Sequence, residues 1–139
     1  MGRMRTVEIG DELEPLVKDV VQEDMDLFES FALLDHPNIH TDPKAAQDAG
    51  VGRDPIASGR MTTAYASEAA ARFFGEKWTG TGKTDLNFIR PVKHGDILTV
   101  RGVVKEKTVE VGGTRVVLDI WVENQRGDKT AVGSASGTL

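Results

Sequence analysis

The chain has 139 residues, enough for one domain with a substantial hydrophobic core. It contains no cysteine, which excludes disulfides, thiolate metal sites and cysteine nucleophiles, and which suits the cytoplasmic location that we expect. The formal net charge of -5 argues against general affinity for nucleic acid, because such binding depends on neutralising phosphates. No apolar run approaches the roughly 18 residues of a membrane-spanning helix, so we expect no membrane partner.

The first part of the chain predicts an edge strand followed by a helix. Residues 9–21 have an extended pattern, and Pro15 suits the edge of a sheet because it cannot donate a ladder hydrogen bond. Residues 23–34 carry apolar side chains at helical spacing, after two acidic residues that suit a first turn. These apolar residues are Met25, Phe28, Phe31 and Ala32.

Two further helices are predicted before residue 75. The shorter one begins after Asp42, a good N-cap, has Pro43 at its first position and stops near residue 50. The longer one covers residues 59–74, with Ser58 as its N-cap. Five residues of the longer helix are alanine, so neighbouring elements can approach it closely.

Beyond residue 75 the pattern predicts a glycine-rich loop over residues 75–83 and then strands with a period of two. Alternate residues of the last strand are alanine or glycine, so one of its faces has almost no bulk and fits the alanine-rich helix. We therefore predict an α+β fold, in which an antiparallel sheet of about five strands curls around one central helix in a single domain, residues 1–139. The strands are predicted at residues 86–89, 97–107, 114–124 and 130–138.

The motif that carries chemistry is Asp-His-Pro-Asn-Ile-His at residues 35–40. Pro37 prevents a regular helix, and a turn can direct the carboxylate of Asp35 and the imidazole of His40 at one small molecule. Such a pair can share the activation of water. The N–H groups at the helix start, near Gly59, suit a substrate carbonyl that gains negative charge. Spacing alone leaves open that Asp35 ends a helix and that His40 is an ordinary turn residue.

Two other motifs are weaker. His36 and His40 have the i, i+4 spacing of zinc-binding helices, but Pro37 disrupts that helix and no third ligand is evident, so we expect no metal. Residues 80–84, Gly-Thr-Gly-Lys-Thr, imitate the end of a phosphate-binding loop, but Lys77 stands where the first glycine of that motif belongs.

The chain resembles the MaoC-like dehydratases, which include the (R)-specific enoyl-CoA hydratases and have the hot-dog fold. The resemblance rests on the spacing of Asp35 and His40, on Gly59 at the helix start, and on residues 88–96, and it covers nearly the whole chain. Two departures are visible. Pro precedes Asn inside the turn, where the family usually has the reverse order, and Ser58-Gly59-Arg-Met replaces the His-Gly-Met of many members.

The resemblance implies the addition of water to a trans-2-enoyl thioester, giving a (3R)-hydroxyacyl thioester, or the reverse dehydration. It maps the catalytic residues onto Asp35, His40 and Ser67, and the oxyanion hole onto Gly59. It implies no cofactor apart from coenzyme A as part of the substrate. It also implies a homodimer or higher homo-oligomer, because the family pairs its sheets and builds the acyl-CoA site at the junction.

Several other residues are candidates for substrate binding. Arginine and lysine side chains suit the phosphates of coenzyme A, two helix residues suit an acyl tunnel, and Asn38 either orients Asp35 or stabilises the turn. For each there is an ordinary alternative: solvated surface, core or turn. The candidates are Asn38, Ser58, Arg60, Met61, Tyr65 and Arg90, with Arg53 and Lys93 as further phosphate ligands.

Two other functions stay open at this point. One is an acyl-CoA thioesterase on the same fold, which would release a free thiol. The other is a non-catalytic acyl-CoA-binding partner subunit of a heteromeric hydratase, which would show activity only with its second subunit.

Overall fold

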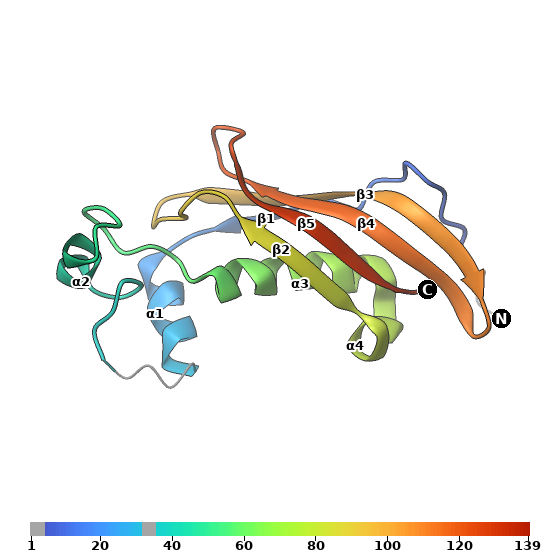
Figure 1. Cartoon of the computed structure of the whole chain (residues 1–139), viewed down its shortest axis with the longest axis horizontal. Coiled ribbons are helices and arrows are strands. Elements are labelled where there is room, and N and C mark those ends of the chain that lie inside the picture. Colours follow the sequence, from blue (N-terminus) through green and yellow to red (C-terminus); the bar gives the residue numbers. More distant parts are fainter. Residues whose placement is uncertain (1–4, 32–35) are drawn as a thin grey trace.

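The computed structural model describes residues 5–31 and 36–139, which form one curled antiparallel sheet with a long helix along its concave face (Figure 1). The strand order is β1-β3-β4-β5-β2, so β1 and β2 are the two edges. The strands are β1 (Leu16–Asp19), β2 (Lys83–Phe88), β3 (Ile97–Glu110), β4 (Gly113–Glu123) and β5 (Lys129–Thr138). The helices are α1 (Gln22–Phe31), α2 (Pro43–Asp48), α3 (Gly59–Phe74) and α4 (Trp78–Thr81), with a 3-10 turn, η1 (Gly75–Lys77).

The core lies between α3 and the middle strands. Alternate residues of β4 are buried against the helix, and the small residues of α3 and β5 meet across the same layer. A Cβ atom added to Gly137 would lie 3.2 Å from the ring of Phe74, so the last strand needs its small residues for this approach. The buried set includes Ala66, Ala69 and Ala70 of α3, Val116, Leu118, Ile120 and Val122 of β4, and Ala131 and Ala135 of β5.

The predicted α+β architecture is confirmed, and α3 has the bounds predicted from the sequence. Its N-cap is Ser58, whose side chain accepts a hydrogen bond from the Arg60 N–H. The N-cap of α2 is Asp42, as predicted, and Pro43 is its first residue. The first strand is an edge strand, but it covers only Leu16–Asp19 of the predicted extended segment.

The predicted loop over residues 75–83 is wrong. Gly75 ends α3 with a φ of 76°, and η1 and α4 follow directly. The indole of Trp78 stacks on Phe74 with ring centroids 5.3 Å apart, and this packing offsets the low helix propensity of the glycines. Strand β2 then begins at Lys83, which pairs with Ser136, three residues before the predicted start.

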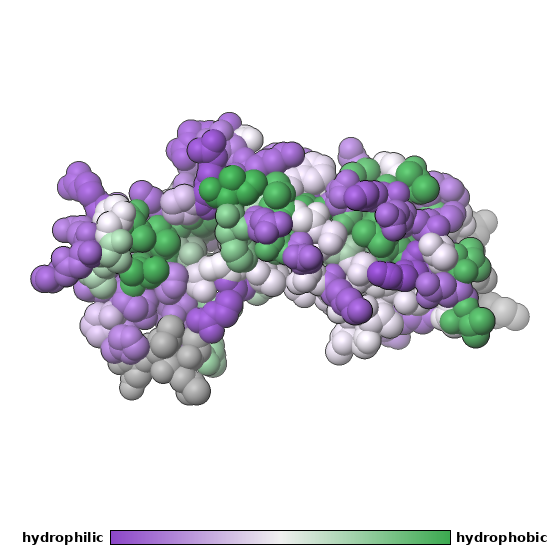
Figure 2. Space-filling model, viewed as in Figure 1, coloured by the Kyte–Doolittle hydropathy of each residue, from purple (hydrophilic) through white to green (hydrophobic). Residues whose placement is uncertain are grey.

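The helix α3 begins at one end of the sheet. Figure 1 shows α1, α2 and the segment that leads into α3 at this end, beyond the strands. Figure 2 shows hydrophobic surface around the end of β2, where the side chains of Phe88 and Ile89 are 54% and 53% exposed. This end of the molecule therefore combines a helix N-terminus, loops and uncovered apolar side chains.

Within residues 5–31 and 36–139, no helix is long and apolar enough to span a membrane.

Candidate active site

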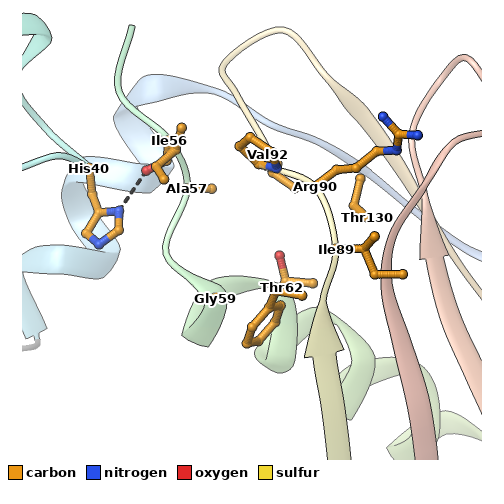
Figure 3. A pocket seen from close by; sticks show the side chains of 11 residues that line it. His40, Ile56, Ala57, Gly59, Thr62, Ile89, Arg90, Val92 and Thr130 are labelled. Carbon is orange, nitrogen blue, oxygen red and sulfur yellow. Dashed lines mark hydrogen bonds between the residues drawn. The ribbon is translucent and has the colours of Figure 1, made fainter. Parts of the chain in front are cut away.

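A cavity of about 360 Å³ opens at the N-terminal end of α3 (Figure 3). Its walls come from the turn that holds His40, the segment that leads into α3, the first turn of α3 and the end of β2. Most of its lining is apolar, and the polar groups are few. The lining residues are His40, Ile56, Ala57, Gly59, Thr62, Phe88, Ile89, Arg90, Pro91, Val92 and Thr130.

The imidazole of His40 is oriented by a backbone carbonyl. Its Nδ1 atom lies 2.8 Å from the carbonyl oxygen of Ile56, and Figure 3 shows this bond. A carbonyl oxygen only accepts hydrogen bonds, so Nδ1 must carry the proton. In the neutral ring, Nε2 then holds the free electron pair, which is the state that a general base requires.

Hydrogen bonds made by two side chains, Asn38 and Gln22, stabilise the turn around His40. The amide oxygen of Asn38 accepts a hydrogen bond from the His40 N–H at 2.8 Å, and its amide nitrogen donates to the carbonyl of His36 at 3.1 Å. The side chain of Gln22 donates to the carbonyl oxygen of His40 at 3.0 Å, which joins α1 to the turn. Asn38 therefore stabilises the turn, one of the two roles considered for it. Asp35, the predicted partner of His40, lies outside the described residues.

Gly59 is the first residue of α3, where helical N–H groups have no carbonyl partner within the helix and the helix dipole is positive. The ring of Phe88 lies directly against it. A Cβ atom at Gly59 would be 2.8 Å from a carbon of that ring, so glycine permits this close approach. The amide end of α3 and His40 thus line the same cavity from different segments.

Arg90 also lines this cavity, but only with its stem. Figure 3 shows its guanidinium group pointing away from the cavity. A neighbouring cavity of about 430 Å³ shares Arg90 and Pro91 with the first one. Its other lining residues are Lys93, His94, Asp96, Asn124, Arg126 and Asp128.

The other candidate residues do not line the cavity with His40. Ser58 is buried as the N-cap, and Met61 is part of the hydrophobic core. Arg60 is mostly exposed, with a guanidinium nitrogen 3.8 Å from the buried carboxylate of Glu29. Arg53 lines a separate surface depression beside α2. Their roles in substrate binding stay predictions.

Tyr65 and Ser67 both lie further along α3. The ring of Tyr65 is half-buried below the ammonium group of Lys18, at 5.5 Å from the ring centroid. Burial raises the pKa of Tyr65, and the nearby carboxylates of Asp24 and Glu68 raise it further. The hydroxyl of Ser67 accepts a hydrogen bond from the Trp78 indole at 3.1 Å. The catalytic role of Ser67 stays a prediction.

Most of the lining was not recognised from the sequence. Phe88 and Ile89 belong to the segment on which the resemblance rests, but nothing in the sequence predicted that they would line a cavity. Thr62 follows Gly59 by three residues, the spacing that keeps two residues on one helix face, and this was the available signal. Within the described ranges, no group of three histidine or acidic side chains is arranged to hold a metal ion.

A family model for the MaoC like domain matches residues 6–132. The chain belongs to the MaoC-like dehydratase family. The resemblance drawn from the sequence is therefore confirmed, and the curled sheet around α3 is the hot-dog fold.

Solved structures have the same fold. The R-hydratase PhaJ1 from Pseudomonas aeruginosa is 27% identical with a TM-score of 0.79, over 96% of this chain and 82% of that chain. The (R)-hydratase from A. caviae involved in PHA biosynthesis is 20% identical with a TM-score of 0.78, over 98% and 99% of the two chains. The ChsH1-ChsH2 complex from Mycobacterium tuberculosis is 16% identical with a TM-score of 0.77, over 96% and 99%. No curated protein sequence matches the chain.

Proposed function

We propose that this MaoC-like protein adds water to, or removes water from, the 2,3 bond of an enoyl or 3-hydroxyacyl thioester, with R configuration at C3. The observation that carries the proposal is the placement of His40 and Gly59 on one cavity, with Nδ1 of His40 fixed by the Ile56 carbonyl. An oriented imidazole and a helix N-terminus are the two groups that hydration of an enoyl thioester requires.

In the proposed reaction, His40 and Asp35 together take a proton from water while the oxygen of that water bonds to C3 of the enoyl group. The electron pair of the double bond moves toward the thioester and gives an enolate-like oxygen. The N–H of Gly59 and the positive end of α3 stabilise that oxygen. A proton returned to C2 completes the addition, and dehydration follows the same steps in reverse.

The carrier that we propose is coenzyme A. The second cavity adjoins the first through Arg90 and Pro91. Its lining includes four residues whose side chains are cationic or can be protonated: Arg90, Lys93, His94 and Arg126. In a chain with a net charge of -5, such a local cluster is where phosphates would bind. Of these four, Arg126 lies near a carboxylate, 3.6 Å from Asp128, whereas Arg90 and Lys93 have no ion pair within the described residues.

We also propose that two copies of the chain associate through β2. This strand is an edge of the sheet, so its outer N–H and C=O groups are available to a second strand. Phe88 and Ile89, at and just after its end, are half exposed and also line the cavity, so a second copy there would cover the site. We also propose a cytoplasmic location, which suits a sequence without cysteine.

The test is a spectrophotometric assay with crotonyl-CoA and longer enoyl-CoA thioesters. We expect loss of the enoyl absorbance, formation of the (3R)-hydroxyacyl product and no release of free thiol. Release of thiol without loss of the enoyl group would show a thioesterase instead. The molecular mass in solution, measured by light scattering, should correspond to at least two chains.

A second candidate function has one observation in its favour. Two structurally similar proteins are complexes by name, ChsH1-ChsH2 and HadBC, the latter described as a 3R-hydroxyacyl-ACP dehydratase. If the pure protein is inactive and a second subunit restores hydration, this chain is one part of a heteromeric hydratase.

A further inference from the structure

The cavity contains a hydroxyl group that the reaction described above does not use. Thr62 lies in the first turns of α3 and is only 3% exposed. Figure 3 shows its hydroxyl oxygen turned away from the helix, into the space between Ala57 and Val92. Because Thr62 lines the cavity, its hydroxyl adjoins the space in which a ligand would bind.

The neighbouring residue, Thr63, makes the hydrogen bond that is usual for a threonine inside a helix. The hydroxyl of Thr63 donates to the carbonyl oxygen of Gly59 at 2.9 Å, the usual bond of a helical threonine to the preceding turn. Among the described residues, the hydroxyl of Thr62 has no such bond. The other threonine of the cavity, Thr130, donates to the carbonyl of Val122 at 3.2 Å. As far as the described residues go, Thr62 is therefore the hydroxyl of the lining that stays available to a ligand.

The position of Thr62 relative to Gly59 defines which part of a ligand it would meet. Three residues advance a helix by about 4.5 Å, and helical side chains lean back toward the N-terminus. The hydroxyl of Thr62 therefore reaches back toward the level of the Gly59 amide, on the same face of α3. Both residues line the cavity.

From this geometry we infer that Thr62 is a second hydrogen-bond donor to the thioester oxygen, beside the N–H of Gly59. A carbonyl oxygen has two lone pairs, and an enolate oxygen accepts hydrogen bonds more strongly than the carbonyl it comes from. Two donors at one helix end therefore stabilise the enolate more than the bound substrate. This inference rests on the proposed function.

The experiment compares Thr62→Val, Thr62→Ser and Thr63→Val with the full-length wild-type protein. Thr62→Val keeps the shape and removes the hydroxyl, so kcat for crotonyl-CoA should fall about 10²–10³-fold, with little change in KM. Thr62→Ser keeps the donor and should stay within a few-fold of the wild type. Thr63→Val removes only the local bond to Gly59 and should leave kcat nearly unchanged. The pH dependence of kcat should be the same in every variant, because His40 is not altered.

A binding measurement separates this inference from the proposed reaction. Acetoacetyl-CoA forms an enolate whose absorbance differs from that of the keto form. The wild type should bind it and raise the enolate fraction, and Thr62→Val should lower both affinity and enolate fraction. If the wild type hydrates crotonyl-CoA and Thr62→Val keeps full kcat, the inference is overturned and the proposed function stands.

The remaining outcomes are also decisive. Equal loss in Thr62→Val and Thr62→Ser, with unchanged melting temperatures, would show that keeping the hydroxyl does not preserve activity, and it would overturn the inference. If Thr62→Val does not fold, Thr62→Ala takes its place, because alanine is the best helix former. A wild-type protein that neither hydrates crotonyl-CoA nor binds acetoacetyl-CoA would overturn the proposed function and this inference together.

Discussion

The two ends of α3 have different roles: one packs against the sheet, and the other lines the cavity. Toward the C-terminus, Ala66, Ala69, Ala70 and Phe73 are buried against the sheet. At the N-terminus, Gly59 and Thr62 face a cavity, and the polar groups there are available to a ligand. Stability and proposed chemistry therefore lie at opposite ends of one helix, so substitutions should affect them separately.

The largest effect should come from His40. Replacing it by alanine removes the proposed base, so the hydration rate should fall by about 10²–10⁴-fold. The melting temperature should change little, because the side chain is only partly buried and, among the described residues, makes one hydrogen bond, to Ile56. The matched control is His36→Ala, in the same turn, whose side chain is exposed. A His40→Ala variant as active as the wild type would remove the proposed mechanism.

Leu118→Ala should have the opposite effect to His40→Ala: it should lower stability and leave activity unchanged. This side chain is fully buried under α3, so its truncation should lower the free energy of unfolding by about 2–5 kcal/mol. Denaturant titration measures the loss, and the rate per folded molecule should stay that of the wild type. Asp119→Ala, on the exposed face of the same strand, should change stability by no more than about 0.5 kcal/mol. Loss of activity in folded Leu118→Ala would show that the two regions are coupled.

The basic cavity beside the site should give a smaller, selective effect. Exposed ion pairs contribute about 0.2–1 kcal/mol, so Arg90→Gln or Lys93→Gln should raise the KM of crotonyl-CoA up to about fivefold. The effect should shrink at high salt and be absent with crotonyl-pantetheine, which lacks the nucleotide phosphates. Lys105→Gln, on an exposed part of β3, is the control. An equal KM increase for both thioesters would place the nucleotide elsewhere.

The smallest effect concerns Tyr65. Burial, with Asp24 and Glu68, raises its pKa above the value of about 10 for an unfolded chain. Its contribution to stability is therefore complete below about pH 10 and is lost as the pH rises through the folded-state pKa. Tyr65 is the one tyrosine of the sequence, so phenolate absorbance reports it alone. A native titration curve that coincides with that of the urea-unfolded protein would contradict this, and Tyr65→Phe should reduce the loss of stability at alkaline pH.

The regular elements could largely be predicted because each depends on local properties of the chain. The spacing of apolar residues, the cap at Ser58 and the alternation in β4 and β5 are all readable from neighbouring residues, and they placed α3 and the last strands correctly. The prediction at residues 75–83 failed because it considered only the glycines and not the aromatic side chains beside them. There the glycines predict a loop, whereas the stacking of Trp78 on Phe74 supports two short helical turns.

The residues of the site also fall into two groups: those identified from the sequence and those that only the fold brings to the cavity. His40, Gly59 and Arg90 were identified from spacing and resemblance, and the structure brings them to one cavity. The remaining walls come from segments far apart in the sequence, so their meeting depends on how the sheet curls around α3. Thr62 and Thr63 are adjacent residues of the same type, and no local pattern distinguishes them. The sequence by itself determined the helix, its cap and the reactive histidine, because these follow from short-range interactions. Only the tertiary structure decided that Thr62 faces a cavity while Thr63 bonds to its own helix, because that depends on which surface of α3 the sheet and the loops cover.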